Sequence, residues 1–155
     1  MITLPEQFKI VQGYVGQGTT ALVTADSVSL KNAVMCWVVV NLDTTASSAC
    51  ALLLYRTTAV GSAGVVLTNV VPIWANLDTA TTDTLVRRTA AVSYTTAANA
   101  AYKQIIFEVD PASLGSTYDC IYLTAGALAA TEALSVEYFI EYRYEQATPP
   151  AAITD

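Results

Sequence analysis

The sequence contains no histidine, and charged residues make up only 13% of its 155 residues. Histidine changes charge near neutral pH, which makes it the most frequent general acid or base and a frequent metal ligand. Without it, catalysis would need carboxylates, thiols or lysines in a recognisable arrangement. The sequence shows no such arrangement, and we expect a protein that is not an enzyme.

Serine chemistry illustrates this restriction. A Ser-His-Asp triad is impossible without histidine, and a serine–lysine pair would need a buried lysine beside the hydroxyl. No pattern in the sequence marks a lysine as buried. The residues concerned are Ser27, Ser29 and Ser93, with Lys9, Lys31 and Lys103.

Two pairs of carboxylates, Asp110 with Asp119 and Glu137 with Glu141, are candidates for an acid and a base. A glycosidase pair must face one cleft several ångströms apart, with the pKa of one carboxyl raised. Glu137 and Glu141 fall on the polar side of an alternating strand, where solvation is the ordinary environment. The sequence therefore predicts no catalytic residue.

Neither a metal nor a cofactor is predicted. Asn76, Asp78 and Asp83 share a polar loop, but their spacing differs from that of a calcium loop and they supply too few carboxylates. The glycines between Gly13 and Gly18 precede residues that favour strands, whereas a phosphate-binding loop opens a helix. We therefore interpret the glycines as a flexible turn and the acidic residues as turn formers.

The three cysteines, Cys36, Cys50 and Cys120, lie in apolar, strand-like surroundings. No two have C-x-x-C spacing and no histidine accompanies them, so a zinc site is not expected. We interpret them as small buried side chains, with one disulfide and one free thiol as the alternative. The odd number favours folding in a reducing compartment.

Acidic residues outnumber basic ones by 13 to 7, which gives a net charge of −6. Nucleic acids are bound by clustered Lys and Arg, and the one adjacent pair, Arg87 and Arg88, would point to opposite faces of a strand. The longest apolar run spans residues 33–40, whereas a membrane helix needs about 20 residues. The N-terminus has no basic region followed by an apolar core. We therefore expect no direct nucleic-acid contact, no membrane contact, and synthesis in the cytoplasm.

Apolar and small neutral residues are in excess. Hydrophobic residues make up 54% of the chain and its mean hydropathy is +0.44, while the charged share is well below the ~25% typical of soluble domains. Charge is depleted at the cores of protein interfaces, so such a surface favours burial against a partner. We expect a homo-oligomer or a component of a larger assembly, with a monomer of uncharged surface as the alternative.

The residue pattern is that of strands, because Val, Ile, Thr and Tyr dominate while Lys, Glu and Gln are sparse. Apolar and polar residues alternate with period two along residues 136–145 and again along 102–109, which a helix would not show. The expected strands span residues 8–14, 28–30, 34–42, 50–57, 65–74, 85–95, 102–109, 118–123 and 136–145.

Short strands at this spacing predict an all-β fold, an antiparallel two-sheet β-sandwich with jelly-roll-like topology. We expect one domain, residues 1–146, and an extended C-terminal arm, residues 147–155, which contains Pro149 and Pro150. Pro72 indicates an edge strand or a bend. The alanine-rich segment 125–134 is the one candidate for a short helix.

Aromatic residues offer a second hypothesis. Tyrosine, which is present nine times, suits protein interfaces and sugar-binding faces alike. We interpret Tyr138, Tyr142 and Tyr144 as one half-buried sheet face. Trp37 and Trp74 lie in apolar runs and are expected to be buried; exposure of either in a shallow groove would favour glycan binding.

Several segments of the sequence, taken together, are similar to those of a known protein family. They are residues 28–33 leading to Trp37, residues 69–74 running into 83–87, residues 107–112 and 119–121, and Arg143-Tyr144 followed by residues 149–153. Together they resemble a family of small structural proteins encoded among the head genes of tailed bacteriophages. The resemblance covers nearly the whole chain and contains no chemical motif.

This resemblance implies a capsid decoration (cement) protein or another minor virion component, with a β-sandwich fold and often a trimeric state. The resulting hypothesis is a non-enzymatic protein of the capsid surface that binds and stabilises the shell. Its expected partners are the major capsid protein or other virion proteins, and further copies of itself, with a trimer favoured. The alternatives are a lectin-like, glycan-binding jelly-roll module and a tail or head-completion component of the virion.

Overall fold

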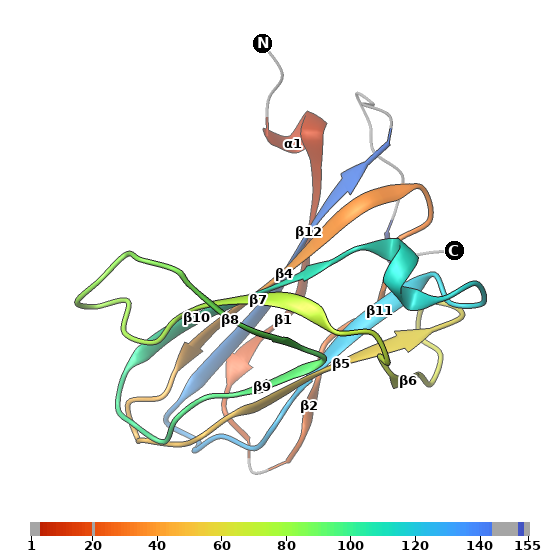
Figure 1. Ribbon diagram of the computed structural model, residues 1–155. Coiled ribbons are helices and arrows are strands. Elements are labelled where there is room, and N and C mark those ends of the chain that lie inside the picture. The colour runs from red at the N-terminus through yellow and green to blue at the C-terminus, as the bar shows by residue number, and fades with distance from the viewer. Residues whose placement is uncertain (1–3, 20, 144–151, 154–155) are drawn as a thin grey trace.

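The computed structural model describes residues 4–19, 21–143 and 152–153. Their regular structure is almost entirely β-strand, arranged as two antiparallel sheets that pack against each other (Figure 1). One turn of helix, α1 (Leu4–Gln7), precedes the first strand, and a 3₁₀ turn, η1 (Pro111–Leu114), follows β10. The all-β sandwich expected from the sequence is confirmed.

Sheet A has six strands in the order β1-β12-β4-β10-β7-β8. Their bounds are β1 (Phe8–Gln17), β12 (Ala133–Tyr142), β4 (Ala33–Asp43), β10 (Tyr102–Val109), β7 (Val71–Asn76) and β8 (Val86–Ala91). The first and the last strand of the described residues are therefore neighbours, and β12 lies between β1 and β4.

Sheet B has the order β2-β11-β5-β6, with β3 also paired to β11 and β9 also paired to β5. Their bounds are β2 (Val23–Thr24), β3 (Val28–Ser29), β5 (Ala51–Thr57), β6 (Val65–Val66), β9 (Ser93–Thr95) and β11 (Cys120–Ala125).

The chain changes sheet at most of its connections. Strands β1, β4, β10 and β12 lie in sheet A, and the strands between them in sequence include β2 and β3, β5 and β6, and β11 in sheet B. The order β1-β12-β4-β10 opposite β2-β11-β5-β6 is that of a jelly roll, and β7 and β8 extend sheet A beyond this set. The jelly-roll-like expectation is thus confirmed.

The hydrophobic core fills the space between the two sheets. On β12, Val136, Tyr138 and Ile140 are buried, while the intervening Glu137 and Phe139 are only half-buried. Because successive side chains of a strand point to opposite faces, one face of sheet A packs on the core and the other faces outward. The expected period-two pattern is confirmed over these residues; Tyr144 and Glu145 lie outside the described residues.

The expected helix at residues 125–134 is wrong. β11 continues to Ala125, a loop follows, and β12 begins at Ala133. The backbone N–H of Gly126 bonds to the carbonyl of Ala51 at 2.8 Å, which holds the loop against β5. Pairing with a neighbouring strand here outweighs the helix propensity of the alanines.

Two segments expected as single strands are divided. Residues 65–74 contain β6 in sheet B and the start of β7 in sheet A, and residues 85–95 contain β8 in sheet A and β9 in sheet B. Pro72 is not on an edge strand, because β7 pairs with both β10 and β8. The β7–β8 register shifts between Val71 and Ile73, and such an irregularity accommodates a residue that lacks a backbone N–H.

The expected C-terminal arm, residues 147–155, lies outside the described residues except for Ala152 and Ile153. Ala152 is fully buried in the core, and its carbonyl accepts a hydrogen bond from the backbone N–H of Ser29 at 2.6 Å. Ile153, in contrast, is 54% exposed. The chain therefore contributes at least one side chain to the core after residue 146.

Candidate interaction face

The outer face of sheet A, the face turned away from the core, is unusually apolar. Register pairs Phe139 of β12 with Trp37 of β4, and it pairs Val39 of β4 with Ile106 of β10. We use the term apolar face for six outward side chains, which are Ile10, Trp37, Val39, Trp74, Ile106 and Phe139. They come from five adjacent strands and form two neighbouring rows across the sheet.

Partial exposure distinguishes these side chains from the core. Ile10 is 43% exposed, and the other five are half-buried by their neighbours on the same face. Trp37 packs edge to face with Phe8 at a centroid distance of 5.7 Å. The guanidinium of Arg87 lies 6.0 Å from the centre of the Trp74 ring. A patch of this composition is the kind of surface that binds another molecule.

The expectation that Trp37 and Trp74 are buried is wrong, since both are half-buried. The apolar run 33–40 suggested a strand covered on both sides. In the structure Cys36 and Val38 are fully buried between the sheets, while Trp37 points outward. Nothing in the sequence of β4 itself distinguishes a face covered by the same chain from one open to a partner.

Charge on this face is sparse and is mainly negative. Glu108 is paired in register with Trp37, and Glu137 with Val39. Glu141 is paired with Met35 towards the α1 end of the sheet. These glutamates are half-buried beside apolar neighbours, and Arg87 is the positive counterpart on β8.

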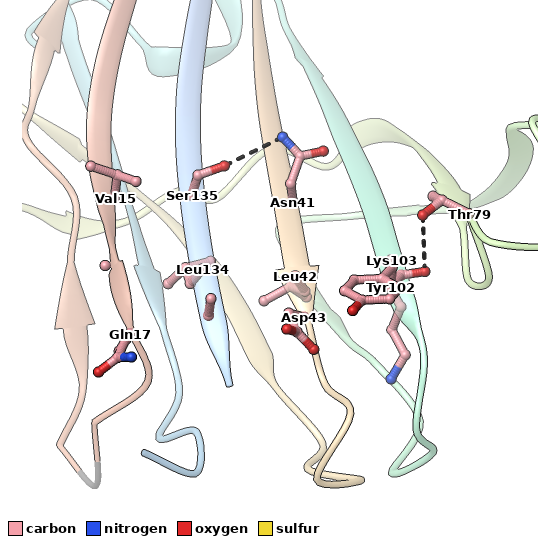
Figure 2. A pocket seen from close by; sticks show the side chains of 12 residues that line it. Val15, Gln17, Asn41, Leu42, Asp43, Thr79, Tyr102, Lys103, Leu134 and Ser135 are labelled. Carbon is pink, nitrogen blue, oxygen red and sulfur yellow. Dashed lines mark hydrogen bonds between the residues drawn. The ribbon is translucent and has the colours of Figure 1, made fainter. Parts of the chain in front are cut away.

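A groove of about 530 Å³ lies at the opposite end of the same outer surface (Figure 2). Its floor is formed by the ends of β1, β12, β4 and β10, and its lining includes Val15, Asn41, Tyr102 and Ser135. Thr79, from the loop after β7, forms part of its wall. That loop is held beside β10 because the backbone N–H of Thr79 donates to the carbonyl of Tyr102 at 2.9 Å.

A row of polar side chains crosses the groove end of the sheet. Gln104 donates from Nε2 to Asn41 Oδ1 at 3.0 Å, and Asn41 donates from Nδ2 to Ser135 Oγ at 3.4 Å. These residues are directly paired in the strand register, so the three side chains come from adjacent strands β10, β4 and β12. Figure 2 shows Asn41 and Ser135 linked in this way.

Beneath this end of the sheet lies a buried polar group of residues that the sequence did not indicate. Lys103 is only 2% exposed, and its Nζ donates to the carbonyls of Ala97 at 2.7 Å and Asn99 at 3.2 Å. Burial lowers the pKa of Lys103, although the negative charge of Glu132 opposes this shift. The sequence pattern gave no sign that Lys103 is buried. Its ammonium group bonds to the two main-chain carbonyls and not to Ser27, Ser29 or Ser93.

Glu132 is fully buried and acts as a structural acceptor. Its carboxylate accepts hydrogen bonds from the backbone N–H groups of Ser48 at 3.0 Å and Ala129 at 2.9 Å. Burial by itself would raise the pKa of Glu132, but these hydrogen bonds outweigh it, so the pKa is lowered. Through these hydrogen bonds, the carboxylate of Glu132 holds the loops at this end of the sandwich together.

The carboxylates considered for catalysis have other environments. Asp110 accepts a hydrogen bond from the backbone N–H of Ala112 at 2.8 Å and so caps η1. Asp119 forms an ion pair with Lys31 at 3.5 Å. Glu137 and Glu141 lie on the outer face of β12, as their position in the alternation predicted.

The residues considered for metal binding and phosphate binding also have local structural roles. Asn76 donates to the carbonyl of Thr82 at 2.6 Å and accepts from the backbone N–H of Asp78 at 3.0 Å, so it organises its own loop. Among the described residues no group of three or more acidic, cysteine or histidine side chains is placed to hold a metal ion. The expected flexible turn at Gly13 is wrong, because β1 continues through it to Gln17 with an irregular register after Gln12.

Serine and cysteine side chains are likewise distributed rather than gathered. Ser27 Oγ accepts from the backbone N–H of Gly61 at 2.7 Å, and Ser93 is exposed on β9. The three cysteines, Cys36, Cys50 and Cys120, are buried and form no disulfide with one another, which confirms their interpretation as small buried side chains. Burial raises the pKa of Cys36 well above its usual range and raises that of Cys50 to about 11.

The apolar face and the groove are the features that sequence reasoning missed. The signal of the apolar face was present in the alternation, since residues 37, 39, 106 and 139 are apolar at positions opposite to the core set. No family model and no curated protein matched this sequence. Within the described ranges, no helix is long and apolar enough to cross a membrane.

Proposed function

We propose that this protein is a non-enzymatic structural component of a tailed-bacteriophage virion, which binds the capsid surface as a decoration (cement) protein. The observation that carries the proposal is the apolar face of sheet A. A six-stranded sheet with two tryptophans, a phenylalanine and three aliphatic residues on its outer side is suited to burial against another protein.

Three further features support this proposal. The surface is poor in charge, with a net charge of −6 carried by few residues. The side chains considered for chemistry serve as caps, ion pairs and core residues. The resemblance of the sequence to phage head proteins supplies the kind of partner, which is the major capsid protein or another virion protein.

Self-association belongs to the same proposal. In a homo-oligomer, for which we favour a trimer, the apolar face of one copy would pack against its neighbours or against the shell. Interfaces of this type exclude charge from their centre, so a charge introduced there opposes assembly.

The first experiment determines where the protein is found in purified phage particles, by mass spectrometry of separated heads and tails. The proposal requires it on heads. A protein found on tails instead would support the alternative of a tail component, and absence from particles would refute both.

The second experiment measures the mass of the purified protein by light scattering at low micromolar concentration. Ile106→Lys places a charge at the centre of the apolar face, and Val70→Lys places one at a 63% exposed position before β7 as the control. We expect the wild type and Val70→Lys to be oligomeric, and Ile106→Lys to be monomeric with an unchanged circular dichroism spectrum. A monomeric wild type that also fails to bind capsids would refute the proposal.

A further inference from the structure

We propose that the groove at the end of sheet A binds a neutral sugar, such as a short oligosaccharide. This inference concerns residues outside the apolar face and goes beyond a role in assembly. The groove volume of about 530 Å³ falls within the ~300–1,000 Å³ range of small-ligand sites.

Tyr102 supplies the surface on which a sugar ring would stack. It begins β10 and is 50% exposed, although it lies on a sheet with a neighbour on each side. Its backbone carbonyl accepts hydrogen bonds from both the N–H and the Oγ1 of Thr79, at 2.9 and 3.4 Å, which fixes the backbone at this point. A tyrosine ring offers an apolar body with a polar tip, and the C–H face of a pyranose is complementary to it. Val15, 64% exposed, provides a second apolar contact in the lining, from β1.

Hydrogen-bonding groups lie between these two apolar contacts. Asn41 and Ser135 hydrogen-bond to each other, and each retains capacity for more bonds, because an amide nitrogen has two hydrogens and a hydroxyl both donates and accepts. Asp43 lies one row further along; one of its oxygens accepts from the backbone N–H of Thr45 at 3.0 Å, and a carboxylate can accept several more bonds. Adjacent donors and acceptors of this kind match the hydroxyl groups of a sugar.

The charge of the lining determines which ligand class is favoured. Among the described residues of the lining, the one basic residue is Lys103, whose ammonium group points to the carbonyls of Ala97 and Asn99 rather than into the groove. Asp43 adds a negative charge, so a phosphate or another anion would be repelled. A purely hydrocarbon ligand would cover Asn41 and Ser135 without hydrogen-bonding to them, which is unfavourable. A neutral polyhydroxylated ligand carries no negative charge that Asp43 would repel, and its hydroxyl groups can hydrogen-bond to Asn41 and Ser135.

The test is a titration of ¹⁵N-labelled full-length protein with maltose, lactose, cellobiose and chitobiose, each up to about 10 mM, the range of weak binding. We expect at least one disaccharide to shift the amide resonances of groove residues, among them Asn41, Tyr102 and Ser135. Tyr102→Ala should weaken this binding about tenfold, which corresponds to the loss of one aromatic contact. Tyr102→Phe retains the ring and should bind within a few-fold of the wild type.

Val70→Ala serves as the control for an exposed apolar residue outside the groove, and it should bind as the wild type does. Spectra of the free variants establish that each is folded. The inference is overturned when none of the four sugars shifts groove resonances, when the shifts fall on another surface, or when Tyr102→Ala binds as tightly as Tyr102→Phe. It is also overturned when only inorganic phosphate or sodium octanoate shifts the groove. None of these outcomes affects the assembly proposal, which the Ile106→Lys variant tests separately.

Discussion

The side chain of Glu132 hydrogen-bonds to the backbone of Ser48, which lies 84 residues earlier in the chain, with a distance of 3.0 Å from the N–H nitrogen to Oε1. The other carboxylate oxygen accepts from Ala129, within the same loop. This buried carboxylate therefore joins the connection before β5 to the connection before β12. Charged acceptors form stronger hydrogen bonds than neutral ones, so these two loops depend on the ionised form.

Because of Glu132, the free energy of unfolding should decrease as the pH is lowered. Its pKa is lower in the folded state than in the unfolded state, so the stabilisation is fully present above the unfolded pKa of about 4.3 and is lost as the pH falls through the folded value. Glu132→Gln should reduce the free energy of unfolding by about 2 kcal/mol near neutral pH. The amide nitrogen of glutamine is a donor, and it would replace an oxygen that accepts a hydrogen bond from a backbone N–H group. Urea denaturation at a series of pH values measures both effects.

The control for this variant is Glu137→Gln on the outer face, which should change the free energy of unfolding by less than about 0.5 kcal/mol. The Glu132→Gln protein should also lose less stability than the wild type on acidification. Equal acid sensitivity in the two proteins would show that Glu132 is not the titrating group.

Ala152 and Ile153 form a matched pair of adjacent residues with opposite environments, the first fully buried and the second 54% exposed. Ala152→Gln should lower the free energy of unfolding by about 1–3 kcal/mol, because the core has no room for the larger polar side chain. Ile153→Gln should have little effect. Thermal denaturation of the two variants measures the difference, and identical melting temperatures would contradict the placement of Ala152 in the core.

Gly18 should tolerate no side chain. A Cβ atom there would lie 2.3 Å from the backbone carbonyl oxygen of Ala129, and backbone atoms cannot move aside easily. Gly16 is the matched comparison, since its nearest neighbour would be the flexible end of the Tyr14 side chain at 2.8 Å. Gly18→Ala should therefore cost about 1–3 kcal/mol of unfolding free energy and Gly16→Ala less. Chemical denaturation that ranks them in the reverse order would argue against this loop packing.

The cysteines should react slowly with alkylating reagents in the native protein. Burial raises the pKa of Cys50 to about 11 and that of Cys36 still further, so little thiolate is present near neutral pH, and the side chains are inaccessible. Mass spectrometry after treatment with iodoacetamide should show little labelling of the folded protein, and labelling of all three cysteines in denaturant. Rapid labelling of Cys36 without denaturant would be inconsistent with its position between the sheets.

Local alternation was enough to predict much of the fold. The strand expected at residues 102–109 coincides with β10, and its alternation places Ile105, Phe107 and Val109 on one face, which is the buried face in the structure. A period of two is a property of the strand itself and needs no knowledge of its neighbours. The carbonyls that bind the ammonium group of Lys103 come from the preceding loop, and their direction depends on the tertiary structure.

Where the prediction failed, the deciding contacts were between segments distant in sequence. The alanines of residues 125–134 favour a helix by composition, but the loop they form is bonded to Ala51 and to Thr19 instead. Trp37 has an apolar sequence environment, but its exposure depends on whether another layer covers the outer side of sheet A. The groove was not predictable for the same reason, because its floor combines four strands and its wall is a separate loop.

The position of β12 also bears on synthesis. Strand β1 is paired in sheet A only with β12, the last strand in the described part of the chain. A ribosome therefore releases β12, the partner of β1, after all the other described strands, and pairing between such distant segments is slow. Because β12 lies between β1 and β4, we expect nascent chains to hold these two strands unjoined until β12 has emerged from the ribosome, and access to a chaperone during that interval should raise the yield of folded protein.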